Sequence, residues 1–584
     1  MKSLKGYDWV LTSAEDRLVM QYMQSYELPE FLARILVSRD VGFEKVTDFL
    51  TPSLKRLLPE PYLLKDMETA VKRTIDAINH NHNIVVYGDY DVDGATASAL
   101  LRRYFRDIGK TTKLYIPDRL DEGYGANPAA LKQLRQAKYD LCLMVDCGTT
   151  SFEALSAAAD CGLEVIVLDH HTAQTKLPEA VAIVNPNRLD QDLFGRDDLR
   201  FLCAAGVAFI FLVALNRSLR ESGYFKNLTE PDLISYLDLV ALGTVCDVMP
   251  LKGLNRALVT QGLKIAKSRR NLGLATLADV AELKTGITSA YHFGFVLGPR
   301  INAGGRVGQA DLGSNLLFTQ CNLEAKEIAL KLNEFNLQRQ EIERKVLDEA
   351  LVQVETQGLD ARSIIMVCGK GWHPGVVGIV SSRLKDRYHK PALVVTDWEG
   401  EPKGELKGSG RSVSGLDMGV LMHQAVHNGL LSKGGGHAMA AGFTISKDCY
   451  DQFYDFMDKA AAPIMQNRQL RLHIDGYLTI DGLNNTFMQA VQKLEPYGNG
   501  HPTPTFAFKH VVCVFVDVLG EQHIRLQLQD ETGKRIKAMA FRSVESPLKE
   551  VINHRGPIEV AGTVKLDEWQ GRQQLTLIVD DIRI

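Results

Sequence analysis

The sequence predicts a multidomain α/β protein with a parallel-sheet domain, a long connecting helix, a second α/β domain and a C-terminal β-barrel of the OB type. In two regions, strands rich in Val, Ile and Leu alternate with helical segments, which is typical of parallel sheets. Residues 323–357 lack Gly and Pro and repeat apolar residues at helical spacing, which indicates one long helix. From about residue 463 onward, short strands separated by turn residues favour a small barrel.

Length and composition exclude several classes of protein. The 584 residues exceed what one core supports, and the net charge of −4 gives no sign of a nucleic-acid partner. Nine cysteines without a C-x-x-C pair predict neither a disulfide framework nor a thiolate zinc site. The N-terminus lacks the apolar segment of a signal peptide, and no apolar run is long enough to span a membrane. We therefore expect a cytoplasmic protein with no membrane contact.

The elements follow in order along the chain. Residues 1–66 form a short, mixed and mainly helical pattern, which we expect to pack on the parallel-sheet domain. In the next region, the predicted strands "NIVVYGD", "YDLCLMVD", "LEVIVLD" and "VAIVNP" alternate with helices such as "ATASALLRRYFRDIG", and a mostly helical stretch follows. The segment "FGFVLGPRINAGGRVGQA" is interpreted as a glycine-rich loop.

The long helix separates this region from the second α/β pattern. An ordinary amphipathic connector is preferred for the helix over a coiled coil that binds a partner. The strands "SIIMVCG" and "PALVVTD" flank the helix "GVVGIVSSRLKDRY", and the glycine-rich segments "GELKGSGRSVSG" and "SKGGGHAMAAGFTI" come after them. The barrel is predicted from five strand segments, "TFAFKHVVCVFVDVLG", "HIRLQLQD", "RIKAMAF", "IEVAGTVKLDEW" and "QQLTLIVDDI".

An acidic stretch, "GDYDVDG", comes directly after the first predicted strand of the parallel sheet. Asp89, Asp91 and Asp93 alternate strictly and are followed by Gly94. The stretch matches the opening of an EF-hand loop, but the twelfth position is Leu100 instead of glutamate and a strand precedes it, so we exclude calcium binding of this kind. A solvated acidic turn is the alternative for this stretch taken alone.

In three more segments, aspartate or histidine residues come directly after an apolar run. The segments are "LMVDCGTTS", "VIVLDHHTA" and "LGTVCDVMP". Because ligands bind at the carboxyl ends of the strands in open parallel sheets, we expect all four segments to meet at one rim. The candidate residues are Asp89, Asp91, Asp93, Asp146, Asp169, His170, His171 and Asp247.

So many carboxylates at one rim favour bound cations, because like charges raise one another's pKa unless a cation neutralises them. Oxygen and imidazole ligands together suit divalent Mn, Mg, Zn or Fe. The set exceeds what one ion needs, and two ions that share a bridging carboxylate would use all of it. Such two-metal sites favour displacement at phosphorus, so the predicted chemistry is phosphoester hydrolysis. Dinucleotide and ATP binding are excluded because neither glycine-rich phosphate motif is present.

The motifs resemble those of a known family. "GDYDVDG", "VDCGTTS", "LDHH" and "GTVCDVMP" stand in the order of the four motifs of DHH-family phosphoesterases, and "WHPGVVGIVSSRL", "GSGRS" and "GGGHAMAAG" resemble the DHHA1 domain. With "IPDRLDEGYG", "LGPRINAGGR" and "LEPYGNGHPTPTF", the chain is similar to the single-strand-specific 5′→3′ exonucleases of this family. The resemblance implies an N-terminal extension (1–66), a DHH domain (67–320), a connecting helix (321–357), a DHHA1 domain (358–462) and an OB domain (463–584).

The resemblance also implies the cofactors and the catalytic residues. Two divalent ions, Mn²⁺ or Mg²⁺, are expected, with Asp146 as the bridge and Asp169 as the hydrogen-bond acceptor that orients the histidines. Tyr87 stands where many DHH enzymes carry a histidine. The implied metal ligands are Asp89, Asp91, Asp93, Asp146, His170 and Asp247, and the implied catalytic residues are Asp146, His170, His171 and Asp89.

A second set of residues is expected to hold the nucleic acid. Ser409 and Arg411 are interpreted as part of a glycine-rich loop whose amides form an anion nest, and the resemblance makes them, with Arg119, a pocket for the 5′-terminal phosphate. The implied DNA-binding residues are Arg119, Arg300, Asn302, Arg306, His373, Ser409, Arg411 and His437. Barrel candidates for stacking and phosphate contact are Tyr497, Phe506, Phe508, Arg525, Arg535, Lys537 and Trp569.

The resemblance thus implies a monomeric exonuclease that releases 5′-mononucleotides from single-stranded DNA in recombination and repair. Its implied partners are a single-strand-binding protein and a RecQ-type helicase. Two alternatives stay open: a DHH phosphodiesterase for short oligonucleotides or cyclic dinucleotides, and a non-catalytic DNA-binding relative. The long N-terminal extension and the barrel favour the long-strand nuclease, and the intact set of acidic residues favours an enzyme.

Overall fold

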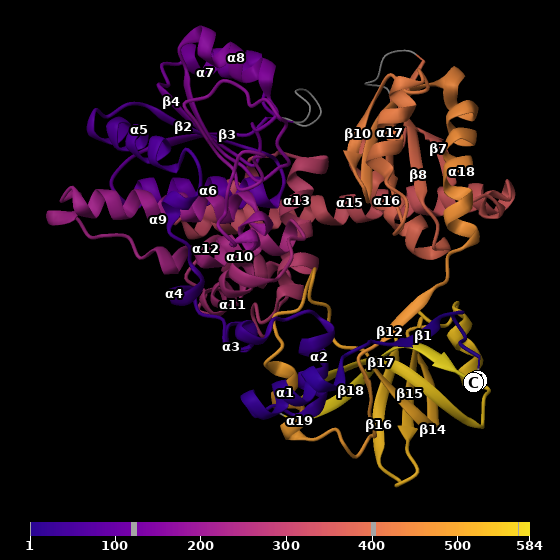
Figure 1. Ribbon diagram of the computed structural model, residues 1–584. Helices are drawn as coiled ribbons and strands as arrows, with labels where there is room; N and C mark the ends of the chain where they lie inside the picture. The colour runs from indigo at the N-terminus through magenta and orange to yellow at the C-terminus, as the bar shows by residue number, and fades with distance from the viewer. Residues whose placement is uncertain (1, 118–124, 399–403, 570–571) are drawn as a thin grey trace.

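A computed structural model describes residues 2–117, 125–398, 404–569 and 572–584 (Figure 1). The first lobe contains the predicted parallel sheet, with strand order β3-β2-β4-β5-β6 and every pair parallel. Its strands are β2 (Ile84–Gly88), β3 (Thr112–Tyr115), β4 (Leu141–Val145), β5 (Glu164–Leu168) and β6 (Ala182–Val184). Four of them were predicted. The edge strand β3 was not, because its four residues are half-exposed or exposed and carry no apolar run.

Helices cover both faces of this sheet. Along β2, Ile84 and Val86 point into the core that contains α5 and α6, whereas Val85 and Tyr87 point into a smaller core under α7 and α8. The helices of this lobe are α5 (Met67–Asn79), α6 (Val92–Asp107), α7 (Pro128–Gln136), α8 (Phe152–Cys161), α9 (Ala204–Glu221), α10 (Leu237–Cys246), α11 (Gly253–Lys267), α12 (Leu272–Val280), α13 (Gly298–Val307) and α14 (Leu312–Phe318). Over the described ranges, no helix combines the length and the apolar character needed to cross a bilayer.

The segment interpreted as a glycine-rich loop is helical instead. It forms a π-helical turn, η6 (His292–Leu297), that runs directly into α13. The glycines are needed for close packing and not for turns: a Cβ at Gly305 would lie 2.8 Å from the carbonyl oxygen of Tyr90, and one at Gly298 would lie 2.5 Å from the sulfur of Cys246. The loop interpretation was wrong because it took glycine as a turn signal where a helix needs room.

One helix joins the two lobes. Helix α15 (Asn322–Thr356) runs from the first lobe to the second in Figure 1, as the sequence predicts. Its N-terminal half buries Ala325 and Leu332 in the core of the first lobe, and its C-terminal half buries Val346 and Val354 in the core of the second. Because both cores include side chains of this one helix, it fixes the spacing of the lobes.

The second lobe contains a five-stranded mixed sheet with strand order β10-β11-β9-β8-β7. The predicted glycine-rich loop "GSGRS" belongs to strand β9, which pairs with β8 on one side and with β11 on the other. The anion-nest interpretation was therefore wrong, because the backbone of this segment takes part in the sheet. The elements are β7 (Ile365–Lys370), α16 (Pro374–Tyr388), β8 (Ala392–Asp397), β9 (Glu405–Arg411), α17 (Met418–His427), β10 (Lys433–His437), β11 (Ala440–Ser446) and α18 (Tyr450–Gln466).

The C-terminal region is a closed five-stranded barrel. The strands follow one another as β14-β15-β16-β18-β17, and β14 pairs with β17 to close the barrel. This confirms the predicted OB-type barrel. Its elements, with the segments that precede it, are β12 (Arg471–Ile474), β13 (Gly476–Tyr477), α19 (Asn485–Gln492), β14 (Phe506–Leu519), β15 (His523–Gln529), β16 (Arg535–Ala540), β17 (Pro557–Trp569) and β18 (Arg572–Arg583).

The N-terminal extension packs mainly on the barrel and not, as predicted, on the DHH region. Strand β1 (Asp8–Leu11) pairs with β12, and the apolar faces of α1 (Asp16–Tyr26) and α2 (Glu30–Ser38) share a core with barrel side chains. Figure 1 shows β1, α1 and α2 beside the barrel. The last part of the extension packs on the first lobe, where α3 (Val46–Leu50) and α4 (Leu54–Leu57) contact α11, and η2 (Pro61–Leu63) contacts α5 and α9. Helix periodicity predicts that an apolar face is buried, but it does not identify the surface that buries it.

Candidate metal centre and nucleic-acid interface

The four predicted segments meet at the carboxyl edge of the parallel sheet. Asp89 follows β2, Asp146 follows β4 and Asp169 follows β5, while Asp247 directly follows α10. Asp89, Asp146 and Asp169 are almost completely buried. Topology alone therefore brings together side chains that are up to 158 positions apart, since Asp89 and Asp247 are the outermost of the four.

One group of potential ligand atoms comes from Asp89, Asp91 and Asp146. One carboxylate oxygen from each lies within 4.8 Å of the others. Asp91 caps the N-terminus of α6, and its Oδ1 accepts hydrogen bonds from the amides of Asp93 (2.9 Å) and Gly94 (3.1 Å). Asp146 has a φ of 61°, a left-handed conformation that is uncommon for a residue other than glycine and typical of functional sites.

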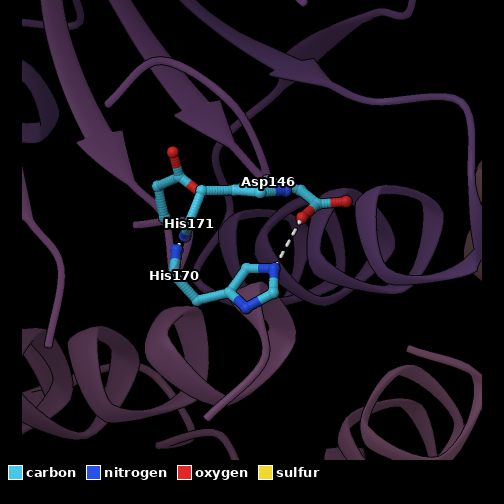
Figure 2. A group of neighbouring side chains, drawn as sticks. Asp146, His170 and His171 are labelled. Atoms are coloured by element: carbon cyan, nitrogen blue, oxygen red, sulfur yellow. Dashed lines mark hydrogen bonds and ion pairs between the residues drawn. The ribbon is translucent and has the colours of Figure 1, made fainter. Parts of the chain in front are cut away.

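The second group consists of Asp93, His170 and Asp247. The Nε2 atom of His170 lies 3.8 Å from Asp93, 3.6 Å from Asp247 and 3.3 Å from Asp146 of the first group. Figure 2 shows the imidazole nitrogen of His170 facing the carboxylate of Asp146. Asp93 also accepts hydrogen bonds from the amides of Ala204 (2.5 Å) and Ala205 (3.0 Å) at the start of α9. Asp146 thus lies between the two groups.

Burial and mutual repulsion make this cluster hard to ionise without cations. Burial, together with the neighbouring carboxylates, raises the pKa of Asp146 well above its usual range. The same two causes raise the pKa of Asp247 to about 8. Burial also raises the pKa of Asp93 and lowers that of His170. The buried Oδ2 of Asp247 accepts no hydrogen bond from any residue that the structure describes. Such a donor set fits divalent cations.

Asp169 holds the two histidines in place. Its Oδ1 accepts hydrogen bonds from the amide of His170 (2.7 Å) and contacts Nδ1 of His171 at 2.7 Å, and its Oδ2 accepts from the amide of Thr149. Burial opposes ionisation of Asp169, but the hydrogen bond with His171 and the nearby histidine charges hold its pKa well below the usual range. Burial lowers the pKa of His171, but Asp169 outweighs it and raises the value to about 9.

Tyr87, at the position where many DHH enzymes carry a histidine, is buried on the opposite face of β2 from the main core. Its ring stacks on that of Tyr115 with centroids 5.2 Å apart. Its hydroxyl donates to the carbonyl of Gly125 (3.4 Å) and accepts from the amide of Asn127 (3.3 Å). One role of Tyr87 is therefore to tether the chain that enters α7.

A cavity of about 630 Å³ opens between the two lobes beside the acidic cluster. Asp91 and Arg306 line it from the first lobe, and Ser409 and Arg411 line it from β9 of the second. Strand alternation places Lys407 on the same face as Ser409 and Arg411, and Lys407 lines the cavity as well. Sequence reasoning missed Lys407 because the segment was interpreted as a loop, whereas the spacing of two residues from Ser409 would have indicated it.

Four other predicted DNA-binding residues, Arg300, Asn302, His373 and His437, are described by the structure and lie outside this lining. Arg300 bridges α13 to α15 by donating to Asn333 Oδ1 at 2.9 Å, and His373 caps α16 by accepting from the amide of Gly375. Asn302 is half-buried on α13, and His437 is exposed at the end of β10. Arg119 falls in 118–124, outside the described residues.

The barrel candidates divide into core and surface. Phe506 and Phe508 are buried in the barrel core, and Tyr497 is mostly buried with its hydroxyl bonded to the carbonyl of Val491, so these three rings pack inside. The Arg525 guanidinium is half-exposed, lies over the ring of Phe515 and pairs with Asp517. Arg535 is exposed, Lys537 is partly exposed, and nothing is described for the side chain of Trp569.

Comparison with known families identifies each part of the chain. Residues 83–244 match the DHH family, N-terminal domain, residues 360–462 match the DHHA1 domain, and residues 474–581 match the RecJ OB domain. The single-stranded-DNA-specific exonuclease RecJ of Salmonella typhimurium is 33% identical over 568 residues, which cover 95% of this chain and 96% of that protein. RecJ of Thermus thermophilus is 33% identical over 548 residues, which cover 93% of this chain and 74% of that protein.

Solved structures agree with the sequence comparison. The crystal structure of RecJ from Thermus thermophilus in complex with Mn²⁺ matches with a TM-score of 0.81 and 30% identity, over 99% of this chain and 80% of that chain. The complex of the same protein with Mg²⁺ matches with a TM-score of 0.75 and 28% identity, over 99% of this chain and 79% of that chain. In sequence, domain order and fold, the chain belongs to the RecJ family of DHH phosphoesterases.

Proposed function

We propose that the protein is a single-stranded-DNA-specific 5′→3′ exonuclease that releases 5′-mononucleotides by two-metal-ion phosphodiester hydrolysis. The observation that carries this proposal is the cavity between the lobes, which is lined both by Asp91 of the acidic cluster and by Ser409 and Arg411 of β9. A strand end bound by the basic face would have its first phosphodiester beside the acidic cluster. The relatives named as single-stranded-DNA-specific exonucleases support the same activity.

The residues present fit two divalent ions, Mn²⁺ or Mg²⁺. Asp89, Asp91 and Asp146 would hold one ion, and Asp93, His170 and Asp247 the other, with Asp146 as the shared ligand. Such ions supply Lewis-acid stabilisation of the phosphoryl charge and lower the pKa of the attacking water. The raised pKa values of Asp146 and Asp247 support this assignment, because a bound cation removes the repulsion that keeps these carboxyl groups protonated.

The remaining residues of the cluster would orient the substrate and the ligands. Asp169 fixes the ring of His171 by the contact to Nδ1, which leaves the imidazole beside the cluster in one orientation. We assign His171 to the scissile phosphate. Arg411, with Ser409 within 3.2 Å of its guanidinium, is assigned to the 5′-terminal phosphate, which a guanidinium holds bidentately. A pocket for this terminal phosphate makes the direction of digestion 5′→3′.

The test uses single-stranded DNA labelled at either end, incubated with Mn²⁺ or with EDTA. We expect the 5′ label to appear at once as mononucleotide, the 3′ label to persist on shortening strands, and EDTA to stop both. Asp146→Ala is expected to abolish hydrolysis because both ions lose their shared ligand. The control is Asp160→Ala, an exposed carboxylate on α8. Full activity of Asp146→Ala with Mn²⁺, or release from the 3′ end first, contradicts the proposal.

The same assay, repeated with dinucleotides and cyclic dinucleotides and accompanied by a binding measurement, separates the two alternatives. Hydrolysis of dinucleotides or cyclic dinucleotides without digestion of long strands would indicate a small-substrate phosphodiesterase, and binding without hydrolysis would indicate a non-catalytic relative. The wider setting that we propose is DNA recombination and repair in the cytoplasm, with a single-strand-binding protein and a RecQ-type helicase as partners. Pull-down of each purified partner by the intact protein tests those contacts.

A further inference from the structure

Two aromatic side chains stand together on the surface of the first lobe. Tyr291, immediately before η6, is 60% exposed, and Phe295, within η6, is 72% exposed. Their rings stack with centroids 5.0 Å apart and an interplanar angle of 22°. Single exposed apolar residues are ordinary, but a stacked pair of large rings in water marks a contact surface. The pair lies on a π-helical turn, a feature found frequently at functional sites.

The pair lies beside the segment that carries a proposed metal ligand. Cys246, the residue before Asp247, donates from its sulfur to the carbonyl of Phe293 in η6 at 3.4 Å. On its other side, η6 continues into α13, which brings Arg306 to the cavity. The turn that carries the aromatic pair is therefore bonded to the end of α10 and continuous with one wall of the cavity.

A side chain of the barrel lies close to the same pair. The ammonium group of Lys565, on β17, lies 6.0 Å from the ring centroid of Tyr291. Lys565 is exposed. Tyr291 thus stands between a barrel cation and the turn beside the metal centre, where a strand that runs from the barrel to the cavity would pass.

We propose that Tyr291 and Phe295 form a base-stacking platform for single-stranded DNA between the barrel and the metal centre. Stacked bases need flat apolar faces and a nearby cation for the phosphate, and this surface offers both. Every base has a π face, so such a platform holds a strand without sequence preference. The inference rests on the proposed function and adds a position for the nucleotides that follow the scissile bond.

The test measures how affinity grows with strand length in the full-length protein, in EDTA so that no strand is cut. Fluorescence anisotropy compares 5′-phosphorylated strands of about 3 and about 12 nucleotides, since only the longer spans several binding positions. Tyr291→Ala and Phe295→Ala are each expected to weaken binding of the longer strand by about 5- to 100-fold, and so to remove much of the gain with length. Phe295→Trp is expected to retain that gain because it keeps a stacking surface.

The matched control is Phe194→Ala, which removes a ring that is 77% exposed in a loop of the same lobe. It is expected to keep the wild-type affinity at both lengths. As a second measurement, a 2-aminopurine base moved along the strand should be quenched at a defined position, and Phe295→Ala should restore its fluorescence.

Three results decide against the platform. The platform is overturned if the affinity of both alanine variants rises with strand length as much as that of the wild-type protein. Dissociation of a dimer by Phe295→Ala, seen by sedimentation with DNA affinity unchanged, would assign this face to self-association instead. If the wild-type protein neither binds nor cuts a single strand of any length, the proposed function fails and the platform falls with it.

Discussion

Arg256→Ala should loosen the joint between the catalytic lobe and the barrel. Arg256 lies on α11 with only 1% of its surface exposed. Its guanidinium donates to the carbonyls of Phe49 (2.7 Å), Pro496 (3.1 Å), Leu494 (2.9 Å) and Glu495 (2.7 Å), and it lies over the Phe49 ring at 4.1 Å. One side chain therefore joins the first lobe, the N-terminal extension and the segment that leads into the barrel.

The expected loss of stability follows from the carbonyl groups that the substitution would leave without a hydrogen-bond donor. A hydrogen bond to a charged donor contributes roughly 1.5–3 kcal/mol, and the four do not add because they share one group. Burial lowers the pKa of Arg256 to about 10, which shows that its desolvation offsets part of the gain. A buried acceptor left without its donor costs roughly 1–3 kcal/mol, so for several carbonyls that share one donor group we expect a total loss of about 3–5 kcal/mol in Arg256→Ala. Arg256→Lys keeps the charge without the planar fork and should lose about half as much.

Calorimetry of the full-length protein measures the effect, because the barrel and its joint should unfold at lower temperature in the variant. Arg220→Ala is the control, since Arg220 pairs with Glu230 at an exposed site and such pairs contribute less than about 1 kcal/mol. A shift for Arg256→Ala no larger than that for Arg220→Ala would refute the reasoning. It would mean that water replaces the guanidinium at the four carbonyls without loss.

Three further predictions concern the metal centre and the 5′ pocket. Asp169→Asn should weaken Mn²⁺ binding by about 10- to 100-fold, measured by calorimetric titration, because the asparagine amide has one acceptor oxygen and no charge, whereas the carboxylate contacts the histidines with Oδ1 and accepts from Thr149 with Oδ2. Asp247→Asn should raise the melting temperature of the metal-free protein at about pH 8 but not near pH 4: a carboxyl group whose folded pKa is about 8 destabilises the fold progressively as pH rises above its unfolded value of about 4. Arg411→Ala should reduce the preference for a 5′-phosphorylated over an unphosphorylated strand by about tenfold or more, as the ratio of initial rates; an equal loss on both strands would contradict the pocket.

Periodicity and strand-end chemistry were enough to predict much of the fold. The parallel sheet, the long helix and the closed barrel all follow from local patterns that tertiary packing did not override. The acidic rim follows from one rule, that parallel strands end at the same edge. These predictions succeeded because each depends on the local backbone geometry of the strands and helices and not on the identity of a distant segment that contacts them.

Apart from the missed edge strand β3, the failures share the opposite property, since each depends on contacts between distant segments. Gly408 in β9 looks like a loop residue, yet a Cβ there would lie 2.2 Å from the ring of Phe443 on the neighbouring strand. Gly305 is explained in the same way, because a Cβ there would lie 2.8 Å from the carbonyl oxygen of Tyr90. Arg256 gave no signal at all, because its acceptors are main-chain carbonyls that any sequence provides. The need for glycine at a close contact, or for arginine between two domains, can be recognised only when the contacting segment is known.

The acidic cluster has two means of stabilising its charge, and they divide its residues. Asp91 accepts hydrogen bonds from amides at the start of α6, and Asp93 accepts them from amides at the start of α9, so backbone donors of two helix N-termini contact these carboxylates. Asp146 and Asp247 have His170 as their ion-pair partner among the described residues, and burial raises the pKa of both carboxyl groups. Backbone amides thus contact two of these four carboxylates, and cations would stabilise the other two. Metal affinity should therefore respond most strongly to changes at Asp146 and Asp247, whose carboxylates accept no backbone hydrogen bond from the residues that the structure describes.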